Sequence, residues 1–131
     1  MAQTPDSAGR ATTLPNSTLP WMLDMGTASE AARNSGRNVL ILFVAPGNRV
    51  VERLDREFFE SPAMRDLLAK FVLARVSFVN NSRVAYRLGV YGAGTIAVTT
   101  PNGEPLKTVV EIPPSPDDLA KILSDAATSK P

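Results

Sequence analysis

The chain has 131 residues, of which 44% are hydrophobic, and it contains neither cysteine nor histidine. This composition excludes thiolate chemistry, zinc sites built from those side chains, and Ser-His or Cys-His catalysis. The net charge is +1, with 14 basic and 13 acidic residues, so there is no electrostatic footprint for nucleic acid or a membrane surface. We therefore expect one globular domain with no metal, no cofactor and no nucleic-acid partner.

The first nineteen residues differ from the rest in composition. They are rich in Thr, Ser, Pro, Ala and Gly, so residues 1–19 are predicted to be a disordered polar tail and residues 20–128 the folded domain. No apolar run reaches the roughly 18 residues of a membrane span. We expect a soluble chain, cytoplasmic as written, or periplasmic if a signal peptide preceded the tail.

The first predicted elements lead into a buried strand. Trp21 is expected in the core, ahead of a short helix over residues 27–35 that ends at Gly36. Six consecutive apolar residues, Val39 to Val44, then form the pattern of a central strand covered on both faces. The sequence therefore predicts a mixed or parallel sheet.

A helical region comes after this strand. Its apolar residues Val51, Leu54 and Phe58 share one face, and Ser61-Pro62 interrupts it, with Ser61 as the expected cap of a second helical stretch. The apolar residues of that second stretch keep helical spacing: Met64, Leu67, Leu68 and Phe71. The two stretches are one helix broken at the proline or two in tandem.

The remaining elements alternate between strand and helix. A strand is predicted over residues 72–79 and a helix over residues 80–88. A β-hairpin is next, with strands at residues 95–100 and 106–112 joined by the turn Pro101 to Pro105. The last helix begins at Ser115, with Pro116 in its first position and acidic residues in its first turn.

This order of elements resembles the thioredoxin family, and three stretches resemble it locally. They are FVAPGNRVVERLD, LDREFFESPAMRDLLAKFVLARVSF, which is similar to the disulfide-reductase-domain branch, and VYGAGTIAVTTPNGEPL. The resemblance implies an α/β fold of three layers, α/β/α, with a central mixed sheet of about four strands. It also places Asn48 and Val51 at the two positions of the CxxC dithiol, and Gly94 at the position of the cis-proline.

These substitutions remove the chemistry that the family performs. Asn48 cannot act as a thiolate, but asparagine is among the best helix N-cap residues, and Val51 keeps an apolar group in the buried position. The chain is therefore expected to be redox-inactive and not an enzyme. Gly94 is expected to leave an open strand edge beside Tyr91, where an extended peptide could pair with the backbone.

The predicted function is binding of a protein or peptide at this degenerate site, by a chain that is expected to be monomeric. The predicted binding residues are Gly47, Asn48, Arg49, Val51, Tyr91, Gly92, Ala93 and Gly94. Whether Tyr91 contacts a partner or packs at the rim of the core stays open. Two other readings stay open as well: a module that binds an apolar fatty-acyl ligand, and a structural domain of a larger assembly.

Overall fold

The computed structural model describes residues 19–128. The predicted tail lies outside the described residues, except for Leu19, and the domain limits stay a prediction. The element order is α1 Met25–Ser35, β1 Val39–Val44, α2 Arg49–Arg53, the π-helical segment η1 Leu54–Phe58, α3 Pro62–Leu68, β2 Val72–Ser77, α4 Ser82–Arg87, β3 Ile96–Thr99, β4 Pro105–Val109 and α5 Pro116–Ala127.

The sheet has four strands in the order β2-β1-β3-β4. β1 pairs in parallel with β2 and antiparallel with β3, and β3 pairs antiparallel with β4. The outer edge of β2 is partly covered, because the Met22 N–H donates to Leu73 O at 2.8 Å and its carbonyl accepts from Arg75 N at 2.8 Å. The predicted mixed sheet is confirmed.

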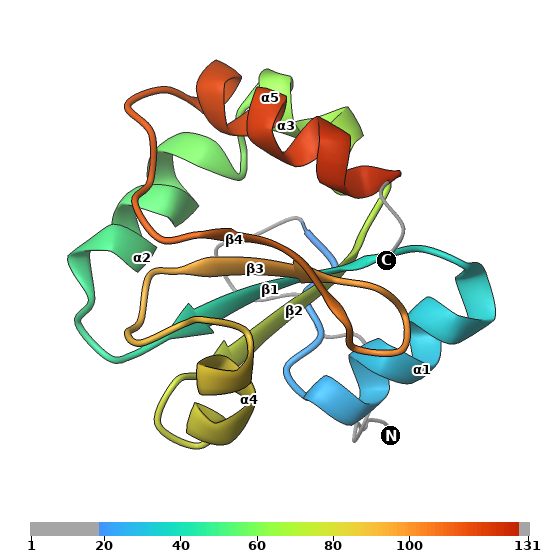
Figure 1. The fold of residues 1–131 in the computed structure, drawn as a ribbon. Helices are drawn as coiled ribbons and strands as arrows, with labels where there is room; N and C mark the ends of the chain where they lie inside the picture. The colour runs from blue at the N-terminus through green and yellow to red at the C-terminus, as the bar shows by residue number, and fades with distance from the viewer. Residues whose placement is uncertain (1–18, 129–131) are drawn as a thin grey trace, which may run out of the picture.

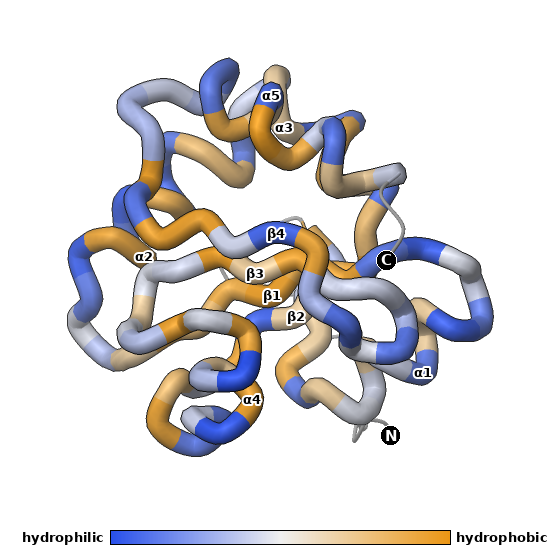
Figure 2. The backbone as a smooth tube through the Cα atoms, viewed as in Figure 1, coloured by the Kyte–Doolittle hydropathy of each residue, from blue (hydrophilic) through white to orange (hydrophobic). Residues whose placement is uncertain are grey.

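Helices cover both faces of the sheet (Figure 1), with α3 and α5 on one side and α1 and α4 on the other. The side chains of β1 divide between two cores accordingly. Leu40 and Leu42 join the core under α3 and α5, while Val39, Ile41 and Phe43 join the core under α1 and α4. Figure 2 shows the hydrophobic residues of β1 and β3 between helices in which hydrophobic and hydrophilic residues are mixed. The prediction of a central strand covered on both faces is confirmed.

Trp21 lies in the first of these cores, as predicted, with no exposed surface. Its ring meets that of Phe59 edge to face, with centroids 5.2 Å apart. The guanidinium carbon of Arg75 lies 5.8 Å from the Trp21 ring centroid, and both terminal guanidinium nitrogens of Arg75 donate to the Asp55 carboxylate at 2.7 Å. This contact ties η1 to β2.

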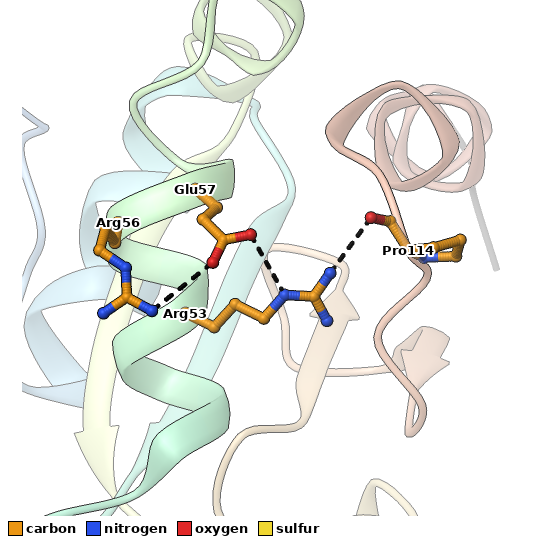
Figure 3. A network of polar contacts seen from close by, with 4 residues as sticks. All are labelled: Arg53, Arg56, Glu57 and Pro114. Carbon is orange, nitrogen blue, oxygen red and sulfur yellow. Dashed lines mark hydrogen bonds and ion pairs between the residues drawn. The ribbon is translucent and has the colours of Figure 1, made fainter.

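The helix after β1 contains a π-helical turn that the sequence pattern did not predict. α2 passes without interruption into η1, whose end is marked by the Phe59 N–H donating to Leu54 O at 2.9 Å. Figure 3 shows Arg53 on this helix between the Glu57 carboxylate, at 3.4 Å, and the Pro114 carbonyl, at 3.1 Å. The side chain therefore joins α2 and η1 to the segment before α5.

Several predicted helix ends need correction. α1 begins at Met25 rather than at residue 27, because the Asp24 carboxylate accepts from the Thr27 N–H at 2.8 Å. Ser61 precedes α3 but does not cap it, since its hydroxyl donates to Phe58 O at 2.7 Å. The predicted cap of α5 is confirmed, with Ser115 Oγ accepting from Asp118 N at 3.3 Å.

The strands of the hairpin are shorter than predicted. β3 spans four residues and β4 ends at Val109, so residues 110–112 lie outside the sheet and Val110 is 69% exposed. The last helix is fixed to the start of β1 by Asn38, whose buried side-chain amide donates to the Ala126 carbonyl at 2.9 Å. This bond closes the core between the first strand and the last helix.

Candidate functional site

The junction between β1 and α2 is organised by Asn48. After β1 ends at Val44, the Asn48 N–H donates to Ala45 O at 3.3 Å, which closes a tight turn. Asn48 has an extended backbone, and its side-chain Oδ1 accepts from the Val51 N–H at 2.9 Å. The predicted N-cap is confirmed, and it satisfies one of the backbone donors that a helix start leaves unpaired.

The two valines after this turn have different environments. Val51 is only 5% exposed and packs in the core with Leu54 and Phe58, as the helical spacing predicts, so its side chain is not available to a partner. Val50 is 41% exposed and was not among the predicted site residues. The signal was present in the sequence, because Val50 is adjacent to the buried face and must therefore point elsewhere.

Gly94 lies against the start of this helix. Its φ is +87°, and a Cβ added there would lie 2.9 Å from Val50 Cβ and 3.2 Å from Asn48 Oδ1. The structure thus brings the 47–50 turn and the 91–94 loop together. No peptide bond within residues 19–128 is cis, so the loop keeps its course without the isomer that characterises the family.

The interpretation of Gly94 as an open strand edge is wrong. Its N–H donates to Phe43 O at 2.7 Å, and the Thr95 carbonyl accepts from Phe43 N at 3.2 Å, so this backbone already pairs with β1. Its neighbours differ: among the described residues, the backbone N–H and C=O groups of Tyr91, Gly92 and Ala93 form no hydrogen bonds. The free backbone therefore lies just before Gly94.

Tyr91 is not a core residue, since 77% of its surface is exposed. Its ring stacks on that of Tyr86 in α4, with centroids 5.6 Å apart and an interplanar angle of 24°. Phe78, just after β2, meets the Tyr86 ring edge to face at 6.1 Å. Three rings thus form a row from the end of β2 to the 91–94 loop.

Exposed arginines occur in the 47–50 turn and in α4. Arg49, Arg83 and Arg87 are exposed, and none has a carboxylate partner within residues 19–128. No Asp or Glu occurs in residues 38–51 or 77–103, which include the turn, α4 and the loop. The nearest carboxylates along the chain are Glu52 and Glu104.

The predicted site residues therefore separate into two groups. Gly47, Arg49 and Tyr91 are exposed, and Asn48, Gly92 and Ala93 are partly exposed, whereas Val51 and Gly94 are buried. A Cβ built on Gly47 or on Gly92 would meet nothing within 4 Å, so the surface is open above both glycines. Within the described part of the chain, no three acidic side chains cluster where they could hold a metal ion.

A shallow groove of about 350 Å³ lies at a different place, between β4 and α5. Its lining is Leu106, Lys107, Lys121, Ile122, Asp125 and Ala126. None of the predicted site residues lines it. Over residues 19–128, no helix has the length and apolar character needed to cross a bilayer.

Solved structures with a similar arrangement of helices and strands include an oxidoreductase, a domain of DsbD and several thioredoxins. The DsbH oxidoreductase superposes with a TM-score of 0.68 at 12% identity, over 88% of this chain and 90% of its own. A thioredoxin from Thermus thermophilus gives 0.65 at 22% identity, over 80% and 84%. The oxidised C-terminal domain of DsbD from Neisseria meningitidis gives 0.66 at 10% identity, over 77% and 90%.

The chain has a thioredoxin-like fold. The α/β class and the resemblance expected from the sequence are confirmed. No protein-family model and no curated protein matches the chain. Because the chain contains no cysteine, this thioredoxin-like fold has no thiol of its own with which to perform disulfide exchange.

Proposed function

We propose that this chain is a redox-inactive thioredoxin-like module that binds an extended segment of a protein partner. The binding surface, which we call the loop surface, consists of residues 47–50 and 91–93. One observation carries the proposal: three consecutive residues, Tyr91 to Ala93, have backbone groups with no hydrogen-bond partner among the described residues, at an open part of the surface. An extended peptide recognises such groups by pairing with them as an added strand.

The surroundings support this mode of binding. Gly92 and Gly47 leave room for an approaching backbone, while Tyr91 and Val50 supply exposed apolar contacts on either side. The first turn of α2 is held by the Asn48 cap and the loop by the Gly94 bond to Phe43. Because both sides are held before binding, little ordering cost opposes association.

The experiment selects binding peptides from a random peptide library displayed on phage and measures their affinities by fluorescence anisotropy. Gly92→Gln places a side chain over the free backbone without a clash, because the glycine has open space and an ordinary φ. Ser124→Gln on α5 is the matched control, since it adds a similar side chain at an exposed position outside the loop surface.

We expect Gly92→Gln to weaken peptide binding by at least about tenfold, and Ser124→Gln to leave it unchanged. Amide NMR shifts should change at residues 47–50 and 91–94. Failure to select any peptide, or equal binding by the two variants, would refute the proposal.

The groove between β4 and α5 favours a second candidate, a fatty-acyl ligand. Its apolar part is formed by Leu106, Ile122 and Ala126, and Lys107 and Lys121 could pair with a carboxylate. Native mass spectrometry of the purified protein, before and after addition of a long-chain fatty acid, tests this function. A bound acyl chain that is lost in Ile122→Glu supports it, and the absence of any adduct argues against it.

A further inference from the structure

We infer that the partner segment is acidic, and that it lies across the stacked rings of Tyr86 and Tyr91. This inference rests on the proposed function, because it specifies the chemistry of the peptide that the loop surface would bind. It comes from two features that the free backbone does not explain: an exposed aromatic pair, and two exposed arginines, Arg49 and Arg83, that have no carboxylate partner among the described residues.

The aromatic pair is exposed but held in place. Tyr86 and Tyr91 are 52% and 77% exposed, and their rings stack at 5.6 Å, with Phe78 edge-on against Tyr86. A ring that is already positioned loses little side-chain entropy when a partner covers it, and tyrosine is among the residues that contribute most to binding energy at interfaces. The pair is therefore suited to contact a partner beside the free backbone.

The charges define the partner further. Arg49 lies in the 47–50 turn, and Arg83 lies one helical turn before Tyr86. The Arg87 guanidinium, in contrast, lies at the other end of β3, 3.9 Å from the Cβ position of Gly103. Arg49 and Arg83 have no carboxylate partner among the described residues. These two exposed positive charges belong to the two segments that adjoin the loop surface and the aromatic pair, so complementary charge on a partner is favoured.

A peptide fits these features better than a nucleic acid does. Stacked rings with arginines also suit single-stranded nucleic acid, but that mode requires a groove of many positive charges along the strand. On the loop surface, the N–H and C=O groups of residues 91–93 have no hydrogen-bond partner among the described residues and provide donors and acceptors that a peptide backbone can complement.

The test uses three fluorescein-labelled short peptides in which valine alternates with glutamate, with glutamine or with lysine. We expect the glutamate peptide to bind at least about tenfold more tightly than the lysine peptide, and to weaken severalfold between about 50 and about 300 mM salt. Arg83→Glu should weaken the binding of the glutamate peptide about fivefold and strengthen the binding of the lysine peptide. Tyr91→Ala should weaken the binding of all three peptides, whereas Leu23→Ala, which truncates an exposed apolar residue just before α1, should not.

The outcomes separate the two proposals. If the three peptides bind equally and Gly92→Gln abolishes their binding, peptide recognition stands and the acidic preference is wrong. If none binds at any salt concentration although library-selected peptides do, the acidic preference is wrong and peptide recognition stands. If no library peptide is selected either, both are wrong. Tighter binding of a short oligothymidylate than of the glutamate peptide would overturn the inference and point to nucleic acid.

Discussion

The side-chain oxygen of Asn48 lies 3.2 Å from the point that a Cβ on Gly94 would occupy. Two segments far apart in the sequence therefore meet at a position where only a hydrogen atom fits. The glycine is required twice, by this close approach and by its φ of +87°. A side chain at this position is therefore expected to destabilise the fold.

Gly94→Ala should lower the free energy of unfolding by about 1–3 kcal/mol, through a strained backbone and a clash with Val50 Cβ. Gly92→Ala is the matched control and should change stability by less than about 0.5 kcal/mol, because its φ is ordinary and its surroundings are open. Urea unfolding followed by circular dichroism measures both. Equal stability of the two variants would contradict the close approach of Gly94 to Val50.

Asn48→Ala should cost about 1 kcal/mol of stability, because it removes the acceptor that pairs with the Val51 N–H. Asn48→Asp should cost less, since it keeps an acceptor oxygen and adds a negative charge that the helix start favours. Urea titrations of the two variants, side by side, provide the measurement. If the aspartate variant loses as much as the alanine variant, capping is not what Asn48 contributes.

The Asp55–Arg75 ion pair should show strong coupling. The Arg75 side chain is 15% exposed and that of Asp55 39%, so Asp55→Ala leaves a largely buried guanidinium without its carboxylate, at a cost of about 1–3 kcal/mol. The double variant Asp55→Ala/Arg75→Met should lose less stability than the sum of the losses of the two single variants. A double-mutant cycle by urea unfolding measures the coupling, which we expect to be about 1 kcal/mol or more. Additive losses would show that the pair contributes nothing beyond its parts.

Trp21→Phe should be far milder than Trp21→Ala. The Trp21 Nε1 atom is buried and has no hydrogen-bond partner among the described residues, so phenylalanine removes a polar group that is not satisfied while it keeps a ring against Phe59. The alanine variant should lose about 3–5 kcal/mol. Thermal unfolding by circular dichroism compares them, and a phenylalanine variant as unstable as the alanine variant would indicate that Nε1 has a partner.

The carboxyl of Asp24 should make stability depend on pH. The Thr27 hydroxyl and then the Thr27 N–H donate to it, and these bonds lower its pKa below the ordinary aspartate value. The pKa of Asp24 is therefore lower in the folded chain than in the unfolded chain. The carboxylate contributes its full stabilisation above the unfolded pKa, near pH 4, and this contribution is lost as the pH falls through the folded pKa.

Asp24→Asn provides the comparison, since asparagine also caps a helix but does not titrate. The stability difference between wild type and this variant, from urea unfolding, should be constant from pH 7 to about pH 5. At pH values below about 4, this stability difference should become smaller. The change should be small because the carboxyl is exposed. A difference that does not change with pH would refute this role of Asp24.

The sequence was sufficient for features that depend on local patterns. The six apolar residues of β1 predicted a strand between two layers, and Ser115-Pro116 predicted the start of α5, because strand burial and capping depend on neighbouring residue types. The cap role of Asn48 was predictable for the same reason. Whether the predicted site residues bind a partner stays a prediction.

Other features depend on contacts between distant segments and could not be predicted. The spacing of Val51, Leu54 and Phe58 fits an α-helix, so it gives no sign of the π turn after α2. The stacking of Tyr86 on Tyr91 depends on where α4 lies relative to the loop. The bonding of Gly94 to β1 depends on sheet order, which placed β3 inside the sheet rather than at its edge.

The bond from Asn38 to the Ala126 carbonyl bears on how the chain acquires its structure during synthesis. The amide at the start of β1 has its acceptor 88 residues later in the chain. One face of the sheet also lacks α5 until that helix has been made. A nascent chain that ends before α5 therefore exposes an apolar face and lacks the acceptor for this amide, so the fold is completed only after α5 has been made.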